Sequence, residues 1–508
     1  MPILTLIVFS PLLAAVVLMV LPERSRISIR VTSLFAAAVS LALSIVALTR
    51  FLDGNPLRET LPLIPKLGIS YSLYCDGWSS VLLLLTGIIL FAGCWASWTV
   101  AKRDREFYVL LLVLSTGVFG VFVCLDLFLL FLFYEIAVLP MYLLIGIWGS
   151  SKRIPPKGPL AFAMRIFDVG GREYAAMKLT LMLLGGSALI LVGILAMANQ
   201  GAGTPEFNME ALARVHFPRE LQMWAFPLLW IGFGSLAGVW PFHTWSPDGH
   251  ASAPTAVSML HAGVLMKLGA FGVIRIGMVL LPEGAQAWAP WVGGIAALNV
   301  IYGALSAMAQ TDLKYVIAYS SVSHMGVVLL GAATMTTNGW NGAVFQMFAH
   351  GVMTGMFFAL VGLVYERAHS RDIPSMGGFG KMMPGVAVCF TLAGLSSLGL
   401  PGTAGFVAEF LVFLGAWESN HAAWMVPAVL GAFFTAVYVL RATRMIFWGP
   451  SKAENFPHLS DARGVEWVAL LLLGAMIVLF GVWPALALHP IDITTMSFLP
   501  RITGLLPH

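Results

Sequence analysis

The stretch LHAGVLMKLGAFG, residues 260–272, places Lys267 at the middle of an apolar segment that runs from about Pro254 to Leu280. An apolar segment of this length crosses a bilayer as a helix. A lysine at mid-span costs at least a few kcal/mol and usually faces the bundle interior, a partner or water. About thirteen residues on either side keep its amine from the membrane surface. We therefore expect Lys267 either to line a polar path or to form a buried structural ion pair.

The composition places the whole chain in a lipid bilayer. Of its 508 residues, 59% are hydrophobic and only 10% are charged, and the mean hydropathy is +0.88. Because no water in the bilayer core can satisfy backbone groups, apolar runs of about 20 residues must form helices. The sequence predicts an all-α polytopic membrane protein with about fourteen spans, at residues 3–21, 28–49, 77–100, 107–123, 125–148, 175–198, 222–244, 254–280, 288–308, 314–335, 340–366, 384–416, 423–447 and 467–487.

Lysine and arginine are distributed unequally between the two sides of this arrangement. If the amino terminus lies outside, 19 of the 28 fall in loops on the inner side, and six fall on the outer side, namely Arg50, Arg58, Lys66, Arg214, Arg219 and Arg501. Inner loops of membrane proteins carry this excess, so both termini are expected outside. The first span lacks the basic segment of a signal peptide and is expected to remain as an uncleaved anchor.

The sequence shows no cofactor motif. The four cysteines, at positions 75, 94, 124 and 389, form no C-x-x-C or Cys/His cluster, so neither a zinc site nor an iron–sulfur site is indicated. Despite 51 glycines there is no P-loop and no strand-linked G-x-G-x-x-G. Nothing indicates a nucleic-acid partner. If the protein takes part in redox or energy conversion, we expect the cofactors on other chains.

Two carboxylates lie within predicted spans. Glu135 stands about ten residues into LFLLFLFYEIAVLPMYLLIGIWG, and Glu409 follows GLPGTAG, residues 399–405. A moving cation beside Glu135 would switch its proton affinity. The glycines and proline of GLPGTAG should break their helix, and unwound backbone at membrane depth is tolerated only beside protein or a water-filled cavity. The alternative is a kinked helix whose glutamate is merely solvated.

A second break, GVWPFHTWSPDGHASAP, interrupts the span at 222–244, five spans before the break in 384–416. Paired broken helices are typical of internal repeats in transporters, with the working site near the midplane. We predict N-terminal helices, two inverted repeats of five helices each with a broken helix, and a C-terminal helix with its tail, at residues 1–106, 107–280, 281–447 and 448–508 respectively.

Histidines accompany these charges in the predicted spans. They are His243 after the first break, His261 in the Lys267 segment, His324 and His350. A lone histidine in a membrane more often bonds one helix to another than relays protons. Several of them in one bundle with lysine and glutamate favour a relay, because imidazole accepts and releases protons near neutral pH.

Four segments resemble a known family: FYEIAVLPMYLLIGIWG, PFHTWSPDGHASAPTAVSMLHAGVLMKLGAFGVIRI, DLKYVIAYSSVSHMGVVLLG and LGLPGTAGFVAEFLVFLGAW. They are similar to the antiporter-like subunit M, or subunit 4, of complex I, the proton-pumping NADH:quinone oxidoreductase. The resemblance covers essentially the whole chain. It implies a subunit of an oxidoreductase in the bacterial cytoplasmic membrane, bound to other membrane subunits, with NADH, FMN, iron–sulfur clusters and quinone on partner chains.

The resemblance also implies roles for the buried residues. Glu135 corresponds to the glutamate at the start of a proton channel, Lys267 to its central lysine and Glu409 to the last residue before the exit. His261, His324 and His350 correspond to polar links between them. Together they would carry protons laterally through the membrane.

One position departs from the family pattern. Leu236 stands five residues before Pro241, where the family has a second lysine that pairs with the glutamate at the channel start. A leucine neither holds nor releases a proton, so Glu135 loses its expected partner. Two residues are candidate replacements: His243, two turns further along the same face, and Lys178 at the inner end of its span.

Three functions are compatible with the sequence. The first is a proton-translocating subunit of a complex I-type assembly, driven by quinone reduction in other subunits. The second is a subunit of a sodium/proton antiporter of the Mrp type, in which Glu135 or Glu409 binds Na⁺ with backbone oxygens of a helix break. The third is a membrane spacer that does not pump, for which Leu236 is the main support.

Overall fold

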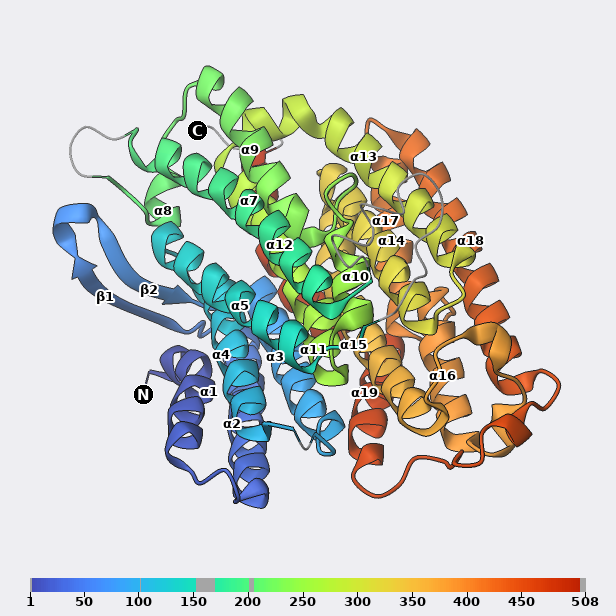
Figure 1. Ribbon diagram of the computed structural model, residues 1–508. Helices are drawn as coiled ribbons and strands as arrows, with labels where there is room; N and C mark the ends of the chain where they lie inside the picture. Colours follow the sequence, from blue (N-terminus) through green and yellow to red (C-terminus); the bar gives the residue numbers. More distant parts are fainter. Residues whose placement is uncertain (1, 101, 152–169, 201–204, 503–508) are drawn as a thin grey trace, which may run out of the picture.

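The computed structural model describes residues 2–100, 102–151, 170–200 and 205–502. Figure 1 shows tilted helices packed side by side in one bundle, with a β-hairpin at one edge. Among the described residues, eleven helical runs are long and apolar enough to cross a membrane: α1 (Ile3–Val20), α2 (Arg26–Leu52), α3 (Gly77–Ala96), α4 (Asp104–Val123), α5 (Leu127–Trp148), α7 (Arg172–Ala198), the run Thr255–Met278, α13 (Pro282–Ala309), α14 (Leu313–Ala333), α15 (Thr337–Ala368) and Ala422–Trp448.

Three of the predicted spans are broken or bent. The helix of segment 222–244, α9 (Arg219–Ala237), ends early, and the chain continues after the break as α10 (Trp245–Ser252). Segment 384–416 divides into α16 (Pro384–Ser397) and α17 (Ala404–Glu418). The last predicted span bends by 65° between α19 (Glu466–Val482) and α20 (Ala485–Ile502), and this pair is a twelfth span if counted as one. The helical membrane class is confirmed, whereas the count of about fourteen spans is not.

Glycines allow the chain to leave the helix at both breaks. Gly238 caps α9 at φ +82°, and Gly399 and Gly402 lie between α16 and α17 at φ +72° and +92°. Only glycine adopts these angles at little cost. At the first break, Asn299 of α13 accepts a hydrogen bond from the Trp240 backbone N–H at 3.0 Å. The unwound backbone therefore finds a polar partner inside the protein, as membrane depth requires.

Residues 50–76 lie between two predicted spans and are expected to form a loop, but the structure has a hairpin there. Strand β1 (Arg58–Ile64) pairs antiparallel with β2 (Ile69–Tyr74). Glu59 of β1 accepts hydrogen bonds from the Leu4 and Thr5 backbone N–H groups of α1, at 2.7 and 3.0 Å. The hairpin is thereby fixed to the first helix. The run Ala422–Trp448 consists of η6 (Ala422–Trp424), α18 (Met425–Thr443) and η7 (Arg444–Trp448). The remaining short elements are α8 (Met209–Leu212), η1 (Pro65–Leu67), η4 (Ile373–Ser375), η5 (Phe379–Lys381) and η8 (Ala453–Asn455).

The segment that carries Lys267 lies at the centre of the bundle. Every residue of its most apolar window is buried, compared with 39% for α1 and 28% for the run Ala422–Trp448. The segment is not a uniform α-helix, because it reads α11 (Thr255–Leu260), π-helix η2 (His261–Leu265), α12 (Met266–Gly272) and π-helix η3 (Val273–Met278). Single π-turns inside helices occur most often at functional sites.

Candidate functional site: a buried row of ionisable side chains

Lys267 is fully buried and has two polar partners. Its Nζ donates a hydrogen bond to the Ala262 carbonyl oxygen in the preceding π-turn. The same Nζ lies 2.6 Å from His350 Nδ1 on α15. The amine therefore avoids the cost of an unpaired buried charge through one backbone and one imidazole contact. No carboxylate of the described chain forms an ion pair with it, so the alternative of a structural ion pair is not supported.

From His350 the row continues to Glu409. The His350 and His324 rings lie 5.2 Å apart, centroid to centroid. His324 Nδ1 lies 3.4 Å from Glu409 Oε1, and both side chains are nearly completely buried. We call Lys267, His350, His324 and Glu409 the central chain. It joins four predicted residues from four different spans, through contacts that no local pattern could specify.

The broken helix supports the Glu409 end of the central chain. Ser397, the last residue of α16, places its Oγ 3.1 Å from His324 Nε2. A side chain at Gly399 would begin 2.7 Å from Glu409 Oε2, so the carboxylate lies directly against the unwound backbone. This contact explains why the break and the glutamate occur together in the sequence.

Two further imidazoles, those of His261 and His250, lie near Lys267. His261 stacks on Trp245, with ring centroids 5.1 Å apart, and lies 3.9 Å from the His250 ring. His250 Nε2 lies 3.4 Å from Met266 Sδ. His250 was missed in the sequence, because it belongs to a segment that reads as an irregular turn. Its spacing of seven residues after His243, two helical turns, was the available signal.

Glu135 lies apart from the central chain. Ser187 of α7 contacts its carboxyl group, but Oε1 is buried without any hydrogen-bond partner. Leu236, on α9, is completely buried. Helices α7 and α9 approach so closely there that a side chain at Gly232 would begin 2.6 Å from the Gly186 carbonyl oxygen. Within the described ranges, no hydrogen bond or ion pair joins Glu135 to Lys267.

Neither candidate replacement for the missing lysine pairs with Glu135. Lys178 Nζ lies 2.8 Å from Asp248 Oδ2 of α10, and Asp248 Oδ1 accepts a hydrogen bond from Tyr315 at 2.9 Å. The idea that Lys178 reaches Glu135 is therefore wrong, because α10 brings a nearer carboxylate. His243 instead packs its ring edgewise on Tyr302 of α13 at 4.9 Å, and neither ring nitrogen has a hydrogen-bond partner.

Another buried cation lies near the first break. Lys314, in the first turn of α14, donates from Nζ to the Ala253 carbonyl oxygen at 2.6 Å. From the sequence, Lys314 is one of the 19 lysine and arginine residues assigned to the inner loops, but the structure buries it. Its helix begins with Asp312 as the N-cap, whose side chain accepts from the Lys314 backbone N–H. Lys314 therefore satisfies the carbonyl that precedes Pro254, at the end of α10.

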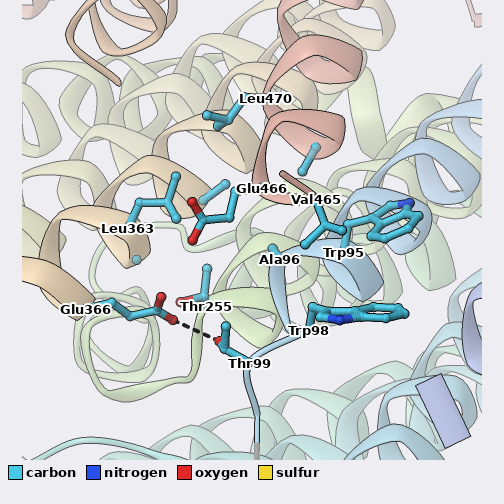
Figure 2. A pocket seen from close by; sticks show the side chains of 13 residues that line it. Trp95, Ala96, Trp98, Thr99, Thr255, Leu363, Glu366, Val465, Glu466 and Leu470 are labelled. Atoms are coloured by element: carbon cyan, nitrogen blue, oxygen red, sulfur yellow. Dashed lines mark hydrogen bonds between the residues drawn. The ribbon is translucent and has the colours of Figure 1, made fainter. Parts of the chain in front are cut away.

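A small pocket elsewhere in the bundle also holds a carboxylate. Glu366, near the end of α15, accepts a hydrogen bond from Thr99 Oγ1 at 3.2 Å, beside Trp95 and Trp98 (Figure 2). Glu366 stands more than four helical turns from His350 along α15, and its hydrogen-bond partner Thr99 lines the same pocket. We therefore do not count it in the central chain. In the part of the chain that the structure describes, no group of three or more His, Cys, Asp or Glu residues could hold a metal ion.

A row of buried ionisable side chains beside two broken helices defines a class of membrane protein that moves protons or ions through the bilayer. Residues 124–435 match the family described as "NADH:quinone oxidoreductase/Mrp antiporter, TM". The chain belongs to this family, so the resemblance found in the sequence is confirmed.

Several known proteins are similar to this chain over its whole length. An NAD(P)H-quinone oxidoreductase chain 4 of Thermosynechococcus vestitus is 36% identical over 517 residues, which cover 100% of this chain and 93% of that one. A chain 4 of a Picosynechococcus species is 37% identical, with the same coverage. A chain of respiratory complex I from Thermus thermophilus is 28% identical, with a TM-score of 0.86, and 98% of this chain and 99% of that one are covered. A chain of the Mrp complex from a Dietzia species, 20% identical with a TM-score of 0.85 and 99% of both chains covered, shares the fold.

Proposed function

We propose that this chain is the proton-translocating, subunit 4-type membrane component of an NADH:quinone oxidoreductase. The observation that carries the proposal is the central chain, in which Lys267 and Glu409 are joined through two buried histidines. The full-length relatives named chain 4 of NAD(P)H-quinone oxidoreductases support it. The redox reaction and its cofactors belong to partner chains, and other membrane subunits are the neighbours of this one.

The geometry of Lys267 and His350 suits proton exchange. A charged amine that donates to the free nitrogen of a neutral imidazole can pass its proton along that hydrogen bond. The imidazolium that forms has both ring nitrogens protonated, and its Nε2 has no other partner within the described residues. The proton on Nε2 is therefore the one available for onward transfer toward His324.

The second half of the transfer ends on a carboxylate. His324 contacts Glu409 through Nδ1 and Ser397 through Nε2, so one imidazole bridges the central chain and the broken helix. The two histidine rings lie 5.2 Å apart, centroid to centroid, and His350 Nε2 makes no hydrogen bond to His324 within the described residues, so a ring rotation or one water completes this step.

Electrostatic interaction between buried charges supplies the driving force for proton transfer along the central chain. Two buried charges interact by several kcal/mol, which is the scale of moving one charge through a proton-motive force. A cation that approaches or leaves one end of the central chain therefore changes where its proton is most stable. In this proposal quinone reduction in other subunits delivers that change.

The excess of Lys and Arg on one side supports an orientation with both termini on the periplasmic side of the cytoplasmic membrane. The division into repeats at 107–280 and 281–447 remains a proposal, supported by one broken helix in each. The alternative function, a subunit of an Mrp-type antiporter, has less support, because the similarity to the Mrp complex chain shows a shared fold alone.

The test is Lys267→Ala in the intact complex, reconstituted into vesicles, with Lys66→Ala in an exposed loop as the control. Removing the amine leaves His350 without its proton donor, so we expect fewer protons moved per electron pair. The control should match the wild type. Proton counts that are unchanged in Lys267→Ala would instead favour the spacer that does not pump.

A further inference from the structure

Two adjoining cavities at the hairpin end of the bundle are lined by arginines. The first has a volume of roughly 390 Å³, and the second, of roughly 720 Å³, shares Arg214 and Arg501 with it. Arg58 of β1 and Arg275 of η3 also line the first cavity. We call the space that these four side chains line the arginine cavity. Arg58, Arg214 and Arg501 are among the six Lys and Arg residues assigned to the outer side of the membrane. Half of the basic residues of that side therefore line one cavity.

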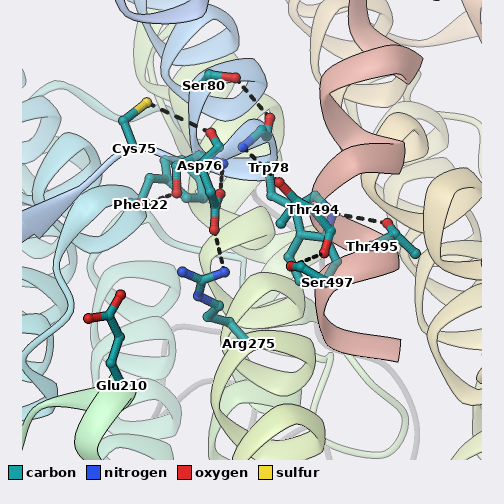
Figure 3. A network of polar contacts seen from close by, with 12 residues as sticks. Cys75, Asp76, Trp78, Ser80, Phe122, Glu210, Arg275, Thr494, Thr495 and Ser497 are labelled. Carbon is teal, nitrogen blue, oxygen red and sulfur yellow. Dashed lines mark hydrogen bonds and ion pairs between the residues drawn. The ribbon is translucent and has the colours of Figure 1, made fainter. Parts of the chain in front are cut away.

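Two of the four arginines are neutralised by carboxylates. Arg58 pairs with Glu210 of α8, and its guanidinium lowers the pKa of Glu210 below the usual range, so this carboxylate stays ionised at neutral pH. Arg275 pairs with Asp76, the N-cap of α3 (Figure 3).

The other two arginines are not neutralised in this way. Arg214 and Arg501 form no ion pair with any residue between positions 2 and 502 that the structure describes. Glu283 lines only the second cavity, so the excess positive charge is concentrated in the first. Both side chains are exposed at the wall of the cavity, where their positive charges favour an anion between them.

Aromatic rings hold the neutralised pair in place. The Arg58 guanidinium lies over the Tyr74 ring, and that of Arg275 lies over Phe498, each 4.6 Å from the ring centroid. Contacts of this kind restrict a flexible side chain. Val279 and Leu280 supply an apolar wall. The cavity therefore combines two arginines that have no ion-pair partner among the described residues with an apolar surface, which fits an amphiphile better than a free ion.

The cavity also lies at the depth of lipid headgroups. Around it the apolar run Thr255–Met278 ends, α13 begins at Pro282 and α3 begins at Gly77. We propose that the arginine cavity binds the phosphate of an anionic phospholipid, with Arg214 and Arg501 as its hydrogen-bond donors. Guanidinium groups match phosphate oxygens through paired, charge-assisted hydrogen bonds. This site is independent of the proposed proton path.

The test is lipid retention by the intact purified complex. Delipidated complex is incubated with phosphatidylglycerol or phosphatidylcholine, and bound lipid is counted by native mass spectrometry. The variant is Arg214→Gln with Arg501→Gln. The control is Lys66→Gln with Arg219→Gln, which removes the same charge from exposed residues of the same side outside both cavities. We expect the variant to bind phosphatidylglycerol at least about tenfold more weakly and the control to be unchanged.

Three other outcomes of this experiment would overturn the proposal. Equal loss in variant and control would mean diffuse surface attraction, and equal retention of phosphatidylcholine would mean that the phospholipid charge is irrelevant. Inorganic phosphate that binds the wild type but not the variant, with phosphatidylglycerol unaffected by the substitutions, would make free phosphate the ligand. If the variant does not assemble, a photoactivatable phosphatidylglycerol is applied to the wild type. Crosslinks to α8 or α20 support the proposal, and crosslinks confined to other subunits or helices contradict it.

Discussion

The Lys267 half of the bundle, which holds the central chain, and the Glu135 half, which holds α5, α7 and α9, each carry an ionisable side chain at membrane depth but surround it differently. Lys267 is fully buried, whereas Glu135 is partly exposed. Lys267 reaches Glu409 through His350 and His324, with the two end contacts at 2.6 and 3.4 Å. Glu135 has a serine beside it and an oxygen with no hydrogen-bond partner. The difference shows that a charge at membrane depth marks a functional position, while only its neighbours decide whether a proton can leave it.

The leucine at position 236 accounts for much of this difference. Leu236 is completely buried where a lysine is expected, and close packing of α7 against α9 surrounds it. Nearby polar groups have other partners, since Lys178 pairs with Asp248 and Trp245 donates from Nε1 to the Ser235 carbonyl oxygen. Among the described residues, no ion pair therefore joins Glu135 to a cation, whereas Lys267 contacts an imidazole of the central chain.

The largest effect is expected from Glu409→Gln in the connected half. An amide keeps the size of the side chain and can still contact His324, but it cannot accept a proton. We expect proton translocation by the reconstituted complex to fall at least about tenfold, which corresponds to about 1.4 kcal/mol on a barrier. Electron transfer measured in the presence of an uncoupler should change less.

The matched control for that variant is Glu418→Gln. Glu418 ends the same helix, is exposed and accepts hydrogen bonds from Asn338. It should pump as the wild type does. If both substitutions slow pumping equally, general damage to α17 is the cause and the central chain loses its support.

A smaller effect, of opposite sign, is expected from Leu236→Lys in the Glu135 half. A lysine in a membrane span costs about 2.5 to 3.5 kcal/mol unless a partner receives it. The carboxylate of Glu135, which has an oxygen without a hydrogen-bond partner, is expected to provide that partner. The complex should then assemble and move more protons per electron pair. Proton counts together with the yield of assembled complex measure this.

Leu229→Lys is the comparison for the Leu236 variant. Leu229 lies two turns earlier on α9, is also fully buried, and packs where a side chain at Gly193 would begin 2.7 Å from its Cδ2. No carboxylate is expected beside it, so this variant should lose assembly. A Leu236→Lys complex that assembles and pumps as the wild type does would show that position 236 has no role here.

The sequence was sufficient for the membrane class and for most of the buried row. Lys267, Glu409, His324 and His350 could be predicted because each is too costly at mid-span to be accidental. Their contacts could not be predicted, since these join α12, α14, α15 and α17 across gaps of up to 85 residues between neighbours in the chain. Which side chains meet depends on helix packing, and no local periodicity specifies it.

Other features were missed for local reasons. The hairpin at 58–74 mixes polar and apolar residues without a clear alternation, and most of β1 is exposed. Helix α20 contains Pro490 and Pro500, so the predicted span ended at 487. Yet α20 is fixed to the bundle by Asp492, which accepts a hydrogen bond from Asn341 at 2.6 Å, and by Thr495, beside Trp78 Nε1 at 3.2 Å.

The smallest effect is expected from Lys178→Gln, and it tests the comparison most directly. Both Lys178 and Asp248 remain about a quarter exposed, and such pairs contribute about 0 to 1 kcal/mol to stability. We expect unchanged proton counts and a pumping rate within about twofold of the wild type. Combining it with Asp248→Asn in a double-mutant cycle on thermal unfolding isolates the pair. A loss of pumping as large as that of Glu409→Gln would mean that Lys178 passes protons onward, because such a weak pair cannot alter rates through stability. The Glu135 half would then possess the mobile cation that its geometry lacks, and the contrast between the two halves would no longer hold.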